Sequence, residues 1–175
     1  YVEFKSAGNT ADFGNLTTSS RRSGGASSET RGVRFGGMNP GRMNVIDFIT
    51  IASVGDASDF GDMTASTADS AGLSSPTRGI IGGGSAPGNV NVVEFITIAS
   101  AGDATDFGDA GSTPPDDSYG CGASNNITGL FAGRASSALV EKITIASAGN
   151  GATFGDLSVT RNNLSGNSNG HGGLS

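Results

Sequence analysis

The stretch FITIASVGDASDFGD, residues 48–62, joins a run of β-branched and aromatic residues to an acidic turn that contains glycine. Residues of the first kind favour strands, whereas Gly and Asp favour turns. The same pattern returns at 95–109 and at 142–156, and YVEFKSAGNTADFGN opens the chain at 1–15. The Phe-Gly pair marks each copy, and its phenylalanines are 47 residues apart: Phe13, Phe60, Phe107 and Phe154. A constant period over four copies indicates one repeat domain over residues 1–175.

Each 47-residue unit reads as four short strands separated by Gly, Asp and Asn turns. The first is a stretch of small residues, such as Ser23–Ser27, and the second is a run such as TRGIIGGG at 77–84. The third is VVEFITIAS at 92–100, and the fourth is the short segment that carries the Phe-Gly pair. No helical apolar periodicity interrupts this order. The sequence therefore predicts an all-β fold of short antiparallel strands.

The third segment suggests how these strands pack. In Val92–Ile98, apolar residues occupy both faces of the expected strand instead of alternating with polar ones. A strand covered on both faces gives that pattern, as in the blades of a β-propeller, where each blade packs between two neighbours. We therefore expect a small β-propeller of about four blades, each with four short antiparallel strands. Crowding at the propeller axis would explain the 30 glycines.

The unit resembles the kelch β-propeller repeat. A small-residue strand, a strand that ends in Gly-Gly (Gly36-Gly37 and Gly83-Gly84), a strand that carries an acid followed by Phe, and a short closing strand are similar to that family's pattern. The usual kelch Trp and Tyr positions are absent, and the repeated phenylalanine stands near where the Trp would be. The phrase ITIAS followed by GDATDFGD also looks like repeat proteins of marine bacteriophages, especially those that infect cyanobacteria.

The chain ends fall inside repeats. Tyr1 aligns with Phe48, within the third segment, and Ser175 aligns with Ile81, within the second. Segments one and two at the C-terminus can therefore pair with segments three and four at the N-terminus to complete one blade, which would remove open sheet edges. Alternatively, the chain is a fragment of a larger ring or of an extended array, or copies polymerise by exchanging these strands.

Composition limits the classes of function. The net charge of −6 argues against nucleic acid as a partner, and no apolar run approaches the length of a membrane-spanning helix, so we expect no membrane insertion. One Cys, one His and two Tyr are a small inventory for catalysis. Cys121 and Ser168, which precedes His171 within GNSNGH, are read as structural residues, and no catalytic residue or cofactor is expected.

The acidic turns are the one candidate for a metal. Oxygen ligands at regular spacing suit Ca²⁺, but the spacing of three and the missing bidentate Glu do not match an EF-hand loop. A solvated turn in which Asp bonds its own backbone is the preferred interpretation. The candidate ligands are Asp56, Asp59, Asp62, Asp103, Asp106 and Asp109.

The arginines of the first full unit are a second cluster of charge. They are expected either to form a locally basic patch or to pair with the repeat's own carboxylates. The cluster consists of Arg21, Arg22, Arg31, Arg34 and Arg42.

These observations favour a non-enzymatic structural or adhesion module, and the phage resemblance implies a virion or extracellular location, for example in a tail fibre. Its partners would be other appendage proteins, further copies of itself, or host-surface carbohydrate. A purely structural repeat that polymerises by strand exchange is one alternative. A polysaccharide-active enzyme on a propeller scaffold is another.

Overall fold

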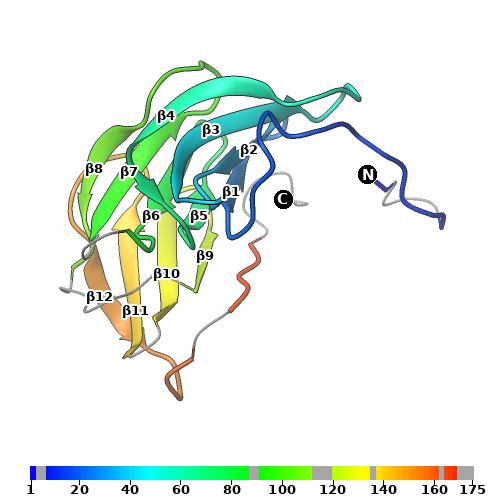
Figure 1. Cartoon of the computed structure of the whole chain (residues 1–175). Helices are drawn as coiled ribbons and strands as arrows, with labels where there is room; N and C mark the ends of the chain where they lie inside the picture. Colours follow the sequence, from blue (N-terminus) through cyan, green and yellow to red (C-terminus); the bar gives the residue numbers. More distant parts are fainter. Residues whose placement is uncertain (3–6, 87–90, 112–119, 135–136, 162–163, 169–175) are drawn as a thin grey trace.

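A computed structural model describes residues 1–2, 7–86, 91–111, 120–134, 137–161 and 164–168. In these ranges the chain forms strands and no helix (Figure 1). The strands make three separate four-stranded sheets, and every neighbouring pair within a sheet is antiparallel. The expected all-β fold of short antiparallel strands is therefore confirmed.

Each sheet takes its strands in chain order, as the repeat predicts. The first sheet contains β1 (Gly24–Ser27), β2 (Arg31–Phe35), β3 (Met43–Thr50) and β4 (Ser58–Thr67). The second contains β5 (Ala71–Ser74), β6 (Arg78–Gly82), β7 (Val92–Thr97) and β8 (Thr105–Asp109). The third contains β9 (Cys121–Ser124), β10 (Thr128–Arg134), β11 (Ser137–Thr144) and β12 (Ala152–Asp156).

The sheets fan out from their first strands. Strand β5 lies between β1 and β9, while β4, β8 and β12 lie on the outside (Figure 1). The small-residue segments are thus the innermost strands, because strands with little side-chain volume can approach one another closely. Two apolar cores fill the spaces between sheets. The core between the first and second sheets includes Phe35, Ile46, Phe60, Ile96 and Ile98. The core between the second and third includes Ile80, Val93, Phe107, Phe131 and Ile143.

Strand β7 bears out the prediction of two covered faces. Val93, Glu94 and Ile96 are buried although consecutive side chains of a strand point to opposite faces. The second sheet therefore packs against a neighbour on each side.

The Phe-Gly pair has a specific structural role in each sheet. In all three sheets the register between the third and fourth strands shifts at this pair, so that Phe60, Phe107 and Phe154 each become the extra residue of a β-bulge. A bulge bends a strand and redirects a side chain. The sequence indicated a marker at this position, and the structure gives its role.

A fourth sheet is absent from the described residues, and this differs from the expected blade built from both chain ends. Two terminal segments instead lie each against a different sheet. The N-terminal segment lies against the first sheet, where Gly55 N–H donates to Phe13 C=O and Ala57 N–H donates to Asn15 C=O. The C-terminal segment 164–168 lies against β9, because the position of a Cβ on Gly166 is filled by the backbone of Gly122.

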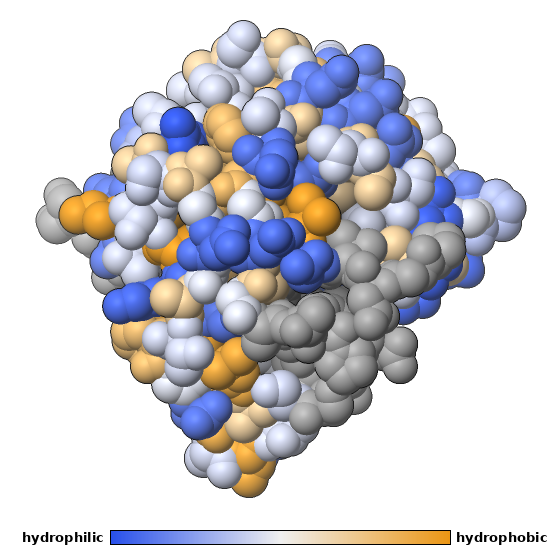
Figure 2. Space-filling model, turned by 90° about the vertical axis from the view of Figure 1, so that its left-hand side faces the viewer, coloured by the Kyte–Doolittle hydropathy of each residue, from blue (hydrophilic) through white to orange (hydrophobic). Residues whose placement is uncertain are grey.

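The surface shows no broad apolar band on the face drawn in Figure 2, where hydrophilic and hydrophobic residues alternate over short distances. Scattered exposed apolar residues are normal for a protein surface. The described part of the chain also holds no helix that could cross a membrane.

Candidate functional site: the junctions between repeats

The most regular constellation of polar groups is the contact between the fourth segment of one repeat and the turn of the next, which we call the junction. Three hydrogen bonds recur there. At the junction of the first and second sheets, Gly102 N–H donates to Phe60 C=O (2.7 Å), Ala104 N–H donates to Asp62 C=O (2.8 Å), and Asp62 N–H donates to Asp103 Oδ1 (2.9 Å).

The other two junctions repeat this pattern. Between the second and third sheets, the side chain that accepts is Asn150, whose Oδ1 lies 3.0 Å from Asp109 N. Between the N-terminal segment and the first sheet it is Asp56, whose Oδ1 lies 2.8 Å from Asn15 N. An amide oxygen and a carboxylate oxygen both accept an N–H bond, which explains why Asn replaces Asp in the last copy.

The six candidate calcium ligands do not act together, because those that accept hydrogen bonds have different partners. Asp56 and Asp103 accept backbone bonds across junctions, and Asp106 accepts from Gly108 N–H within its own turn (3.1 Å). Asp56 and Asp62 of one turn serve different junctions. Among the residues that the structure describes, no three His, Cys, Asp or Glu side chains gather closely enough to hold a metal ion. The preferred interpretation, an Asp that bonds its own turn, fits Asp106, and calcium binding at Asp59, Asp109 and the others stays the less favoured alternative.

A second set of acids was missed by the sequence analysis. Asp47, Glu94 and Glu141 stand at the same place in the third strand of each repeat, 47 residues apart, and are 0%, 4% and 2% exposed. The sequence pattern that could have indicated these buried acids is a single acid among apolar neighbours, as in the segments VIDFIT, VVEFIT and LVEKIT. An unpaired buried carboxylate is costly, so these positions require partners.

The partners of two of these acids are backbone amides of the preceding repeat. Thr64 N–H donates to Glu94 Oε1 (2.8 Å), and Thr17 donates both its N–H and its hydroxyl to Asp47 Oδ2 (3.2 and 2.6 Å). Asp47 also binds the guanidinium of Arg34 through both oxygens, at 2.7 and 2.5 Å. These acids fix the end of one repeat's fourth segment to the middle of the next sheet.

Two arginines couple neighbouring sheets. The guanidinium of Arg31 lies 4.3 Å from the ring centroid of Phe48 and donates to Ile98 C=O at 2.8 Å. The guanidinium of Arg78 lies 4.7 Å from the Phe95 centroid and donates to Ile145 C=O at 3.1 Å. Each arginine thus combines a cation–π contact in its own sheet with a hydrogen bond to the following one.

The remaining arginines of the cluster differ in their partners. Arg22 pairs with Asp69, which raises the pKa of the guanidinium through their hydrogen bond and their charge attraction, and Arg34 pairs with Asp47. Arg42 Nη2 donates to Ser85 Oγ at 2.8 Å, and Arg21 reaches the sulfur of Met38. Pairing with the repeat's own carboxylates, one of the two expectations, is confirmed for Arg22 and Arg34.

The nucleophile candidates lie apart from this network. Cys121 is a free thiol at the start of β9, and burial raises the pKa of its sulfur, which disfavours the reactive thiolate. Ser168 is exposed. His171, the one histidine of the chain, lies outside the described residues.

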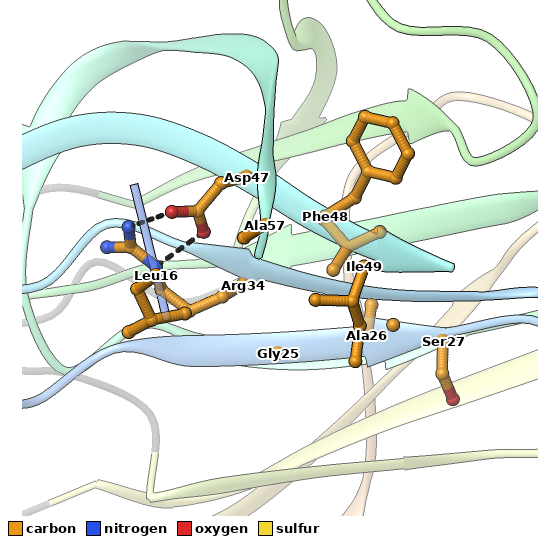
Figure 3. Close-up of a pocket in the computed structure, with 11 residues that line it drawn as sticks. Leu16, Gly25, Ala26, Ser27, Arg34, Asp47, Phe48, Ile49 and Ala57 are labelled. Atoms are coloured by element: carbon orange, nitrogen blue, oxygen red, sulfur yellow. Dashed lines mark hydrogen bonds and ion pairs between the residues drawn. The ribbon is translucent and has the colours of Figure 1, made fainter. Parts of the chain in front are cut away.

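One hollow interrupts the surface of the first sheet. It measures about 440 Å³ and lies on the face of β1, β2 and β3 away from the second sheet. Figure 3 shows the paired Arg34 and Asp47 side chains at one end, with Leu16 beside them. Gly25, Ala26 and Ser27 of β1 form its inner part. Most of this lining is small or apolar, with the Arg34–Asp47 pair already satisfied.

Comparison with known proteins adds no family to this description. The chain matches no protein-family model and no curated protein.

Proposed function

We propose that this protein is a non-enzymatic structural or adhesion module, built on a propeller-type scaffold and located on a virion or in the extracellular space. The observation that carries this proposal is the use of the polar groups at the junctions. Asp47, Glu94, Asp56 and Asp103 all accept hydrogen bonds that hold one repeat to another. Because these acids are used to hold the repeats together, the network favours a rigid scaffold that presents loops over a catalytic site.

The proposed scaffold has four blades. Three are the sheets described above, and the fourth combines strands from the N- and C-terminal ends of the chain. Its support is the placement of Phe13 and Asn15 at a junction identical in its bonds to those of the complete sheets. The kelch resemblance and the 47-residue period agree with this arrangement.

The proposed partner is carbohydrate on a host surface or a neighbouring appendage protein. An acidic surface with a net charge of −6 favours neutral or cationic ligands over anionic ones. The loops that take no part in the junctions are the positions proposed to contact a partner, since binding residues commonly lie on loops held by a rigid scaffold.

A glycan array with the labelled protein tests the adhesion proposal. We expect saturable binding to a restricted set of neutral cell-surface oligosaccharides, with no change in the bound sugar on prolonged incubation. Absence of binding over the whole array would overturn the carbohydrate partner, and release of shortened sugars would overturn the non-enzymatic class.

A strand-exchange polymer is the second candidate, because the hollow on the first sheet is an open receptor for a strand. Mass measurement by light scattering over a range of concentrations separates the two. A constant monomer mass argues for the self-contained module, and a concentration-dependent ladder argues for the polymer.

A further inference from the structure

The innermost segments of the repeats stack through a series of glycines. A Cβ on Gly72 would overlap the carbonyl oxygen of Gly25, and a Cβ on Gly122 would overlap the carbonyl oxygen of Gly72. A Cβ on Gly166 would in turn overlap the carbonyl oxygen of Gly122. Gly25, Gly72 and Gly122 therefore each present a carbonyl to the glycine of the following inner segment, which gives three such contacts among the described residues.

Serines two residues further on form a parallel series. Ser27 N–H donates to Ser74 Oγ at 3.2 Å, and Ser74 N–H donates to Ser124 Oγ at 3.3 Å. The Ser124 hydroxyl also donates to Ser74 C=O at 2.7 Å. Ser168 holds the same place in GNS as Ser27, Ser74 and Ser124 hold in their segments.

The first member of both series lacks the contact that the others have. Within the described residues, the Cβ position of Gly25 meets only the carbonyl oxygen of Val33, at 3.3 Å, from its own sheet. The hollow of about 440 Å³ lies on this side of β1. In the second and third sheets, the equivalent face is covered by the preceding inner strand, so Ile96 is 2% exposed whereas Ile49 is only half-buried.

We propose that the hollow on the first sheet is the docking site for segment 164–168 of the same chain. In the docked form the Gly166 carbonyl faces Gly25, and Ser168 N–H donates to Ser27 Oγ. This inference rests on the four-blade scaffold proposed above, and it names the contact that closes the ring. The proposed contact between Gly166 and Gly25 adds a fourth glycine contact to the three described above and so closes the series.

The properties of the segment fit this site. Gly166, Asn167 and Ser168 are small enough for a surface formed by Gly25, Ala26 and Ser27. The segment already lies against β9 through Gly166, which is the fourth position in the stack, and residues 165–168 are exposed on their other sides. In Figure 1 it runs from the third sheet back toward the inner strands.

The same chain is favoured over a second copy because the segment is tethered. Because Gly166 is held against β9 of the same molecule, the effective concentration of the segment near the hollow is on the order of 1 mM, and a copy in dilute solution competes poorly for the same hollow. The docked segment would also cover the open face of the first sheet in every molecule, independently of protein concentration.

Paired cysteines test the contact. In a Cys121→Ser background, Ser27→Cys with Ser168→Cys places thiols at the proposed contact. Ser27→Cys with Ser74→Cys is the matched control, because the structure already joins those residues by a hydrogen bond. Cα atoms of disulfide-bonded residues lie roughly 4.4–6.8 Å apart, which residues in such contact satisfy. Mild oxidation is followed by mass spectrometry and non-reducing electrophoresis.

We expect the cysteines at 27 and 168 to form a disulfide within one chain, to the same extent as the cysteines at 27 and 74 of the control. Disulfides between chains would overturn the same-chain occupant while leaving a fourth inner strand in place. If the control closes and the 27/168 pair stays reduced, the docking site itself is overturned. The glycan-binding result is independent of all three outcomes.

Discussion

At the scale of single residues, burial separates two ion pairs that look alike in the sequence. The Asp47 side chain is 0% exposed and Arg34 is 13% exposed, whereas Arg22 and Asp69 are 48% and 25% exposed. Removing one partner of a buried pair leaves a charge with neither water nor a counter-ion, but water replaces a lost partner at the surface. The two pairs should therefore respond very differently to the same substitution.

Asp47→Asn is expected to lower the free energy of unfolding by roughly 3–5 kcal/mol, because it leaves the Arg34 guanidinium uncompensated. Asp69→Asn, the matched control, is expected to cost at most about 1 kcal/mol. Urea unfolding followed by circular dichroism measures both. An equal decrease in the free energy of unfolding for the two variants would contradict the stabilising role of the buried Asp47–Arg34 pair.

A glycine in the Phe-Gly pair is required for close approach of two backbones. Gly108 has a φ of +143°, and a Cβ there would lie 2.7 Å from the Gly149 carbonyl group. Gly55 has open space around its Cβ position and no such φ.

Gly108→Ala is expected to lower the free energy of unfolding by at least about 1–3 kcal/mol, the usual cost of strain in a rarely populated backbone region. Gly55→Ala should change it by less than about 0.5 kcal/mol, as an unconstrained surface substitution does. Thermal unfolding of both variants gives the comparison. A harmless Gly108→Ala would show that the junction is looser than described.

At the scale of elements, the arginine at the start of the second strand joins its sheet to the next. Arg78 opens β6, stacks on Phe95 of β7, and donates to the carbonyls of Ile145 and Ala146 beyond β11. The equivalent residue of the third repeat is Thr128, which cannot make these contacts. The third sheet therefore lacks the arginine through which β2 and β6 reach the sheet that follows them.

Arg78→Ala is expected to lower the free energy of unfolding by roughly 1–3 kcal/mol, because it removes charge-assisted hydrogen bonds to carbonyls that then lose their donor. Arg78→Lys should recover only part of this, since an ammonium lacks the planar fork that stacks and donates together. Denaturant unfolding of the two variants provides the test. Full recovery with lysine would indicate that charge alone matters.

At the scale of the whole molecule, the first sheet packs on the second and the second packs on the third, so stability accumulates at the contacts between sheets. The second sheet has an apolar core on both faces. The N-terminal segment is held by the backbone bonds at Phe13 and Asn15 and by the Thr17 bonds to Asp47. Local stability should therefore vary along the chain in a way that the repeat alone does not predict.

Native-state hydrogen exchange is expected to show the slowest amides in β6 and β7 and much faster ones over residues 7–17. Amides in well-packed central strands open only with global unfolding, whereas lightly held terminal segments open locally. Mass spectrometry of exchanged peptides measures this gradient. Equal protection of β7 and residues 7–17 would contradict the description of the N-terminal segment.

The sequence alone determined the number and order of strands in each sheet. The 47-residue period, the small-residue segments and the doubly apolar Val92–Ile98 were sufficient, because local strand preference and burial on both faces are written in residue type. The structure alone revealed that Phe60 occupies a bulge, that Asp56 bonds the neighbouring repeat, and that Glu94 is buried. Those roles depend on which backbone lies opposite each side chain, and that is set by how sheets stack and by no single segment.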